Sequence, residues 1–102
     1  MPIFQTAHYR VRAEAVEKVK AAIVEFVATV AKDEPGTIMY RAWQQESDPT
    51  AFVHLFEFAD EEAHRTHGNT DAVAKFESVY RPELVDGPVV FTDYGQVATN
   101  RS

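Results

Sequence analysis

Histidines and polar aromatic side chains are the residues of this chain whose types suit proton chemistry. His67 stands beside Gly68 at the expected end of a short helix, where its imidazole can lean over a pocket and exchange a proton with a phenol near neutral pH. Tyr40 and Tyr80 carry hydroxyl groups that need partners when buried, and their rings offer flat surfaces to an aromatic ligand. We predict His67, Tyr40 and Tyr80 as catalytic residues. The alternative is a surface or helix-capping His67 and two tyrosines that only pack.

Four further residues are predicted to bind the substrate. Trp43 and Phe56 would contribute aromatic walls, and His64 stands three residues before His67 on the same short helix. Arg81 could hold an enolate or a phenolate by charge-assisted hydrogen bonds. The competing interpretation places Trp43 in the core or in a dimer interface and leaves Arg81 solvated.

Glu61, His64 and His67 are spaced by three residues, so that successive members lie about 60° apart around a helix. A metal site would need neutral imidazoles that converge with a carboxylate. Because the spacing is loose and the helix is short, we prefer a solvated acidic helix start and predict no metal site. The chain has no cysteine, which excludes disulfides, thiolate nucleophiles and cysteine-built metal sites. The sequence carries no phosphate loop, nucleotide fingerprint or nucleophile elbow.

Length, composition and charge narrow the class of protein. The chain has 102 residues, 45% of them hydrophobic, and ten basic against sixteen acidic residues give a net charge of −6. We expect one globular domain over residues 1–102, with residues 99–102 as a loose tail. The acidic balance disfavours a nucleic-acid partner, and no apolar run approaches the ~18 residues of a membrane span. Since no apolar signal-peptide core is visible, we expect a cytoplasmic protein without a membrane partner.

Hydrophobic periodicity predicts the elements that must position these side chains. Alternation of apolar and polar residues indicates half-buried strands, and apolar residues at spacings of three and four indicate helices. Pro35, Pro82 and a turn cluster at 47–50 punctuate these segments, and Asp60 can cap a helix. In chain order the predicted elements are strand 3–11, helix 16–34, strands 37–46 and 51–59, a short helix from 60 that breaks at 67–69, a helix from 70 to about 81, and strand 89–97 after Pro88.

The order β-α-β-β-α-β predicts an α+β fold, in which four antiparallel strands carry the helices on one face in the ferredoxin-like arrangement. The opposite sheet face stays uncovered and would carry large side chains such as Phe4 or Phe56, depending on strand register. An apolar sheet face seldom remains in water, so we expect self-association through it. The alternative is a monomer whose open face is polar enough. His8 and His54 lie in mid-strand, where packing or an interface is the preferred role for both.

A series of short motifs follows in register along the chain: an EPG turn, a tyrosine on the next strand, an Asp-Pro hairpin, an aromatic-x-Asp step and a helix ending in Ala-x-x-x-His. The residues are Glu34-Pro35-Gly36, Tyr40, Asp48-Pro49, Phe52-Val53, Phe58, Asp60, Ala63 and His67. Together they make the chain similar, over nearly its whole length, to the antibiotic biosynthesis monooxygenase family of dimeric α+β barrels.

The resemblance implies a homodimer whose sheets pack face to face, with the helices outside and a pocket between each sheet and its helices. Some members of the family oxidise polycyclic phenols or quinols with O₂ and no cofactor, and others degrade haem or isomerise small sugars or ketones. Many members carry Glu where this chain has Phe56. The haem-site positions of the family correspond here to Ala7, His67 and Glu77, which all differ from the haem-degrading pattern, so bound haem is not expected.

The leading hypothesis is therefore a cofactor-independent monooxygenase acting on a small aromatic, polyphenolic or quinol-type molecule. The alternatives are a non-oxidative isomerase or lyase of a small carbonyl compound, and a dimer that binds a small ligand without turnover. If the protein is an enzyme, His67→Ala should lower turnover by about 10²–10⁴-fold. Because a helix-end histidine adds little packing, we expect that variant to keep nearly the same melting temperature.

Overall fold

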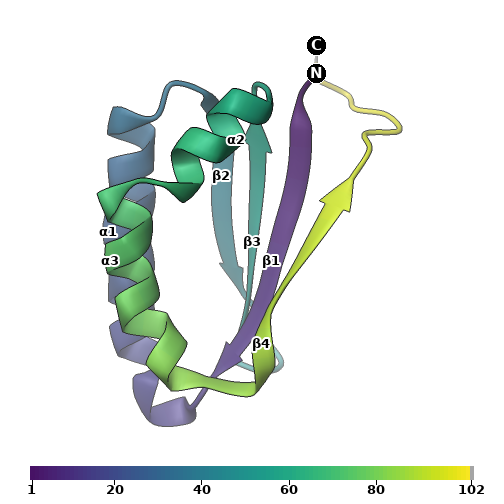
Figure 1. The fold of residues 1–102 in the computed structure, drawn as a ribbon. Helices are drawn as coiled ribbons and strands as arrows, with labels where there is room; N and C mark the ends of the chain where they lie inside the picture. The colour runs from purple at the N-terminus through teal and green to yellow at the C-terminus, as the bar shows by residue number, and fades with distance from the viewer. Residues whose placement is uncertain (102) are drawn as a thin grey trace.

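The computed structural model describes residues 1–101 and confirms the predicted ferredoxin-like α+β fold. Four strands form one antiparallel sheet in the order β2-β3-β1-β4, so β2 and β4 are its edges (Figure 1). The elements are β1 (Ile3–Val11), η1 (Ala13–Ala15), α1 (Val16–Asp33), β2 (Thr37–Gln44), β3 (Ala51–Phe58), α2 (Glu61–Gly68), α3 (Asp71–Tyr80), η2 (Arg81–Glu83) and β4 (Leu84–Tyr94).

The three α-helices cover one face of the sheet, and the core lies between them and that face (Figure 1). Every second residue of the two central strands points into this layer, as period-two alternation requires. The buried strand residues are Ala7, Tyr9, Val11, Phe52, His54, Phe56 and Phe58. The apolar stripe of α1 meets them with Val19, Ile23, Phe26 and Val30, each at most 8% exposed. Burial of these side chains supplies most of the drive to fold.

Two side-chain caps define the short helices that close one end of the core. The Asp60 carboxylate accepts a hydrogen bond from the Ala63 backbone N–H at 2.8 Å and starts α2. The Thr70 hydroxyl accepts from the Val73 N–H at 3.1 Å and starts α3. The predicted break between two helices is therefore confirmed. Gly36 lies against α2 so closely that an added Cβ would be 2.7 Å from the Ala63 Cβ, and this approach brings α2 down onto β2.

The prediction that the last strand begins after Pro88 is wrong, because β4 already begins at Leu84 and ends at Tyr94. Asp86 and Gly87 adopt positive φ angles of 61° and 106°, and the pairing with β1 shifts register between His8 and Arg10. This bulge and the edge position let Pro88 sit inside a strand without a missing ladder hydrogen bond. Residues 95–101 form no helix or strand, and residue 102 of the expected tail lies outside the described residues.

The other face of the sheet is open (Figure 1). Strand register aligns Trp43, Val53, His8 and Val90 in one row across it. Trp43 is 53% exposed and Val90 is 56% exposed. Phe56 faces the helices instead, so the open face does not carry it. No helix within residues 1–101 is long and apolar enough to cross a membrane.

Candidate functional site

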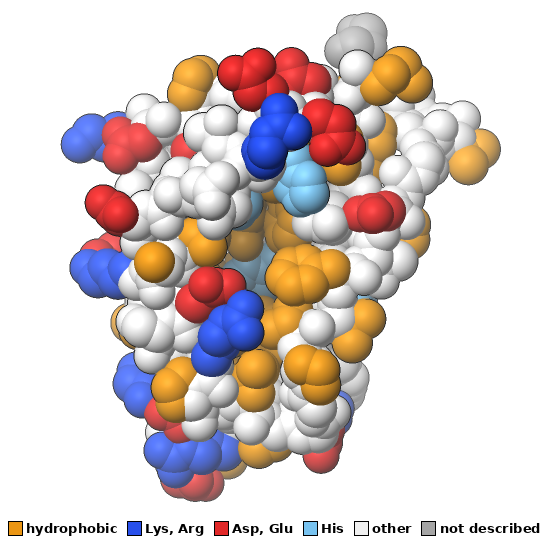
Figure 2. All heavy atoms as spheres, viewed as in Figure 1, with side chains coloured by type: hydrophobic (Ala, Val, Ile, Leu, Met, Phe, Trp, Pro, Cys, Tyr) orange, Lys and Arg blue, Asp and Glu red, His pale blue; other side chains and the backbone are white. Residues whose placement is uncertain are grey.

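A cavity of about 410 Å³ lies between the covered face of the sheet and helices α2 and α3. Figure 2 shows its opening as a hollow, with histidine side chains in pale blue at the rim and at depth among hydrophobic side chains in orange. Most of its lining residues are aromatic or aliphatic, and the polar ones are concentrated in histidine and tyrosine. The rings in its wall come from Tyr9, Phe26, Tyr40, His54, Phe56, His64, His67, Phe76, Tyr80 and Phe91.

His67, from the last turn of α2, is held by a buried carboxylate. Its Nδ1 lies 2.7 Å from Glu34 Oε1, and the side chains are 13% and 5% exposed respectively. Glu34 also accepts a hydrogen bond of 2.9 Å from the Thr37 hydroxyl. An ionised carboxylate only accepts, so the proton of a neutral His67 sits on Nδ1 and the lone pair on Nε2. His67 is therefore arranged as a base whose ring is oriented by the Glu34 carboxylate.

The expectation that His67 contributes little packing is wrong. Its ring centroid lies 5.2 Å from that of Phe58 and 5.8 Å from those of Phe26 and Tyr40. Removing the imidazole would also leave the buried Glu34 carboxylate without one of its donors. Both effects arise because α2 lies on the sheet rather than projecting into solvent.

A second polar group spans the inner wall of the cavity. His54, from β3, is 1% exposed and bonds two tyrosines: its Nε2 lies 2.7 Å from the Tyr9 hydroxyl, and its Nδ1 lies 2.7 Å from the Tyr40 hydroxyl. Burial lowers the pKa of His54 to about 4, so the ring is neutral at pH 7. Burial likewise raises the pKa values of Tyr9 and Tyr40 above the ordinary tyrosine value, so both keep their hydroxyl protons.

The structure brings most of the predicted site residues together around this cavity. His67, Tyr40, Tyr80, Phe56 and His64 all line it. Phe56 stacks on Tyr40 with ring centroids 5.0 Å apart, and burial raises the pKa of Tyr80, which is 5% exposed. The His64 ring lies 4.9 Å from that of Phe58 near the mouth.

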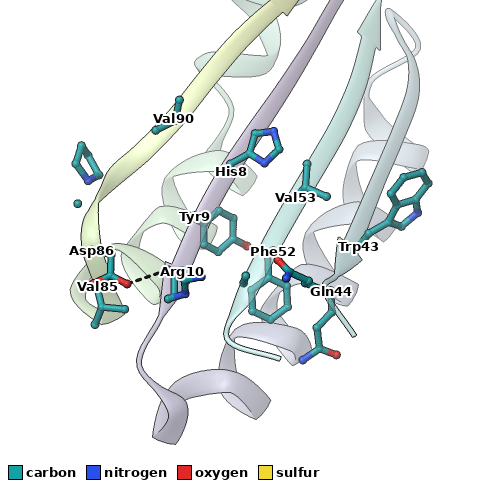
Figure 3. Close-up of a pocket in the computed structure, with 14 residues that line it drawn as sticks. His8, Tyr9, Arg10, Trp43, Gln44, Phe52, Val53, Val85, Asp86 and Val90 are labelled. Atoms are coloured by element: carbon teal, nitrogen blue, oxygen red, sulfur yellow. Dashed lines mark hydrogen bonds and ion pairs between the residues drawn. The ribbon is translucent and has the colours of Figure 1, made fainter. Parts of the chain in front are cut away.

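Trp43 and Arg81 lie elsewhere. Trp43 projects from the open face of the sheet and borders a second pocket there, of about 520 Å³, together with His8, Val53 and Val90 (Figure 3). The Arg81 guanidinium is exposed and pairs with the Glu77 carboxylate at 2.8 Å. Only Glu77 of this pair lines the cavity.

Sequence reasoning did not select Glu34, Tyr9 or His54 as site residues. The only advance signal was alternation, which places Tyr9 and His54 on the same sheet face as the buried aromatics. Glu34 lies 33 residues from its partner His67, and Tyr9 lies 45 residues from its partner His54. Within residues 1–101 no group of three or more potential ligands could hold a metal ion, so Glu61, His64 and His67 do not form one.

Comparison with known proteins agrees with this architecture. The sequence model of the antibiotic biosynthesis monooxygenase family matches residues 2–78. A candidate antibiotic biosynthesis monooxygenase from Bacteroides thetaiotaomicron superposes with a TM-score of 0.89 at 18% identity, covering 99% of this chain and 94% of that one. Candidate members from Nitrosomonas europaea (TM-score 0.86, 19% identity, 94% and 90% covered) and Caulobacter crescentus (0.86, 21%, 95% and 91%) are similar. No curated protein matches the chain.

Proposed function

Because the chain belongs to the antibiotic biosynthesis monooxygenase family, we propose that it is a monooxygenase that oxidises a small aromatic, polyphenolic or quinol-type molecule with O₂ and without a cofactor. The observation that carries the proposal is the His67–Glu34 pair, an oriented base in the wall of an aromatic cavity. Such a substrate reacts with O₂ only after it loses a proton, so the protein has to supply a base and a place for the resulting anion.

His67 takes the proton of the substrate on Nε2, and the buried Glu34 carboxylate stabilises the imidazolium that forms. A tyrosine hydroxyl of the cavity donates to the substrate oxygen on which negative charge develops. The electron-rich anion then reduces O₂. For a substrate of the anthrone type, the ring CH₂ becomes C=O: one oxygen atom enters the carbon, and the other leaves as water with the two hydrogens that the carbon loses.

The cavity wall suits a neutral aromatic guest. Aromatic rings on both the sheet and the helix side can stack on a flat ligand. The described lining residues include no Lys or Arg, and Glu77 places a carboxylate among them. A phosphate or carboxylate ligand would therefore lose hydration without gaining a cation.

The same proposal includes a homodimer formed through the open sheet faces. Trp43, Val90 and Tyr94 are each more than half exposed there. A second sheet would cover these apolar side chains. Trp43 then serves the interface rather than the cavity.

An oxygen-electrode screen over anthrones, quinols and catechols tests the function. With a substrate in hand, His67→Gln removes the base but keeps an amide that can donate to Glu34, so turnover should fall about 10²–10⁴-fold with the fold retained. Glu34→Gln should also lower turnover, whereas the matched control Glu17→Gln, on an 87% exposed carboxylate, should not. Conversion without oxygen uptake would replace the proposal by isomerase or lyase chemistry, and binding without conversion would replace it by a binding function.

A further inference from the structure

The group formed by Tyr9, His54 and Tyr40 carries one more proton than its own hydrogen bonds can use. Two tyrosine hydroxyls and one N–H of the neutral imidazole provide three protons, and these side chains make two hydrogen bonds with one another. No other hydrogen-bond partner of either hydroxyl is found among residues 1–101. Whichever tautomer His54 adopts, one tyrosine donates to it and the other accepts from it. The accepting tyrosine keeps a hydroxyl proton without a protein acceptor.

That proton lies in the cavity wall, because all three side chains line the cavity. A buried donor without an acceptor is unfavourable, so the site favours an occupant that brings an acceptor oxygen. The hydrogen bonds of this group can run in two directions, and each direction presents a different tyrosine to the ligand. Tyr40 is the one that neighbours both histidines, with ring centroids 5.6 Å from His54 and 5.8 Å from His67. Tyr9 is instead stacked between Phe52 and Tyr80.

We propose that Tyr9, His54 and Tyr40 form one directed chain of hydrogen bonds, in which Tyr9 donates to His54 Nε2 and His54 Nδ1–H donates to Tyr40, so that the Tyr40 hydroxyl donates to a carbonyl or phenolate oxygen of an aromatic ligand. Tyr40 contacts the ligand, whereas His54 and Tyr9 are positioning residues that fix the direction of its proton. Each bond in the chain polarises the next, which makes Tyr40 a stronger donor than an isolated tyrosine.

The chain of hydrogen bonds also orients the ligand in the cavity. The acceptor oxygen of the ligand binds at Tyr40, and the ligand lies against the base His67, whose ring neighbours Tyr40. This inference rests on the proposed function for the aromatic nature of the ligand, but its test requires no oxygen and no turnover. A protein that consumes no O₂ can therefore still support it, and an active monooxygenase can still overturn it.

The test compares 9-fluorenone with fluorene, two flat probes that differ by one carbonyl oxygen. The ratio of their dissociation constants is measured by calorimetry for the full chain. Tyr40→Phe should reduce the preference for the ketone by about two- to tenfold, the worth of one hydrogen bond. The control Tyr94→Phe removes a hydroxyl from a 53% exposed tyrosine on the open face and should leave the ratio unchanged. Tyr9→Phe should reduce the preference less than Tyr40→Phe does, because it keeps the Tyr40 hydroxyl in the cavity but no longer fixes the direction of its proton.

Infrared spectroscopy supplies a readout that a loss of packing alone would not move. The carbonyl stretch of bound 9-fluorenone should lie lower in wild type than in a hydrocarbon solvent, and should return toward the hydrocarbon value in Tyr40→Phe. A hydrocarbon-like stretch in wild type overturns the inference without any variant. An unchanged ketone preference in folded Tyr40→Phe also overturns the inference. A loss of preference in Tyr9→Phe but not in Tyr40→Phe overturns it as well, because the hydrogen bonds would then run in the opposite direction.

Discussion

His54 makes the stability of this fold depend on pH above the range in which carboxylates titrate. The ring is neutral in the folded protein because burial lowers its pKa from 6.5 to about 4. In the unfolded chain it titrates near 6.5. Between these two values the unfolded chain binds a proton that the folded protein does not bind, so the free energy of unfolding must fall as the pH is lowered.

The size of the effect follows from the two pKa values. Each pKa unit is worth about 1.4 kcal/mol, so the loss reaches about 2 kcal/mol between pH 7 and pH 5 and about 3 kcal/mol by pH 4. The stability is fully present above pH 6.5 and is lost as the pH falls toward the folded pKa of about 4. Since a small domain has about 5–15 kcal/mol in total, this one ring accounts for a measurable share.

Other groups with lowered pKa values act in a more acidic range. Hydrogen bonds from Arg12 and Lys18 lower the pKa of Glu83 to about 2 from 4.5, so its contribution is lost below about pH 4.5. Hydrogen bonds from Thr50 and Arg10 lower the pKa of Asp48 below its ordinary value of 3.8. The interval from pH 7 to pH 5 therefore isolates the histidine from both carboxylates.

Urea unfolding followed by far-ultraviolet circular dichroism, at one fixed protein concentration, measures the effect at pH 7, 6 and 5. His54→Gln is the matched variant, because glutamine can still donate and accept hydrogen bonds but does not titrate. Wild type should lose about 2 kcal/mol more than His54→Gln over this interval. Equal losses in the two proteins would refute the assignment of a neutral, proton-excluding His54.

Three further outcomes are expected. His67→Ala should lower the free energy of unfolding by about 1–3 kcal/mol, because it removes one of the two hydrogen-bond donors to the buried Glu34 carboxylate. Thermal melting of His67→Ala beside the milder His67→Gln checks this, and an unchanged melting temperature would return His67 to a surface role. Gly36→Ala should destabilise the fold by about 1–3 kcal/mol, because the added Cβ would meet that of Ala63, whereas Gly95→Ala adds a Cβ in open space. Equal urea unfolding midpoints for the two variants would contradict the close contact at Gly36. Light scattering should give twice the chain mass for wild type and a smaller mass for Trp43→Glu, and a strict monomer at high concentration would exclude the sheet-to-sheet dimer.

Local sequence was enough to define most of the fold. The alternation of Ala7, Tyr9 and Val11 with polar residues determined both the strand and its buried face, since side chains of a strand repeat every two residues. The capping side chains of Asp60 and Thr70 determined where the two short helices begin, because each satisfies backbone N–H groups of its own helix. These are short-range interactions, and their partners lie within a few residues.

The start of β4 was not determined in this way. Pro88 reads as the residue before a strand, because proline cannot donate to a ladder. In the folded chain its missing donor is harmless, since β4 is an edge strand with a bulge at Asp86 and Gly87. Whether a strand lies at an edge depends on the order of all four strands, which no single segment encodes.

The site followed the same division. Residue type and spacing brought His67, Tyr40 and Tyr80 to notice, but only the tertiary structure joined His67 to Glu34 and Tyr40 to His54. The Tyr40–His54 pair requires the register of β2 against β3, and the His67–Glu34 pair requires the close approach of α2 at Gly36. The chemistry of a side chain can be read from its type, whereas its protonation and its partners depend on burial and distance. Both of those arise only when segments far apart in the chain pack together.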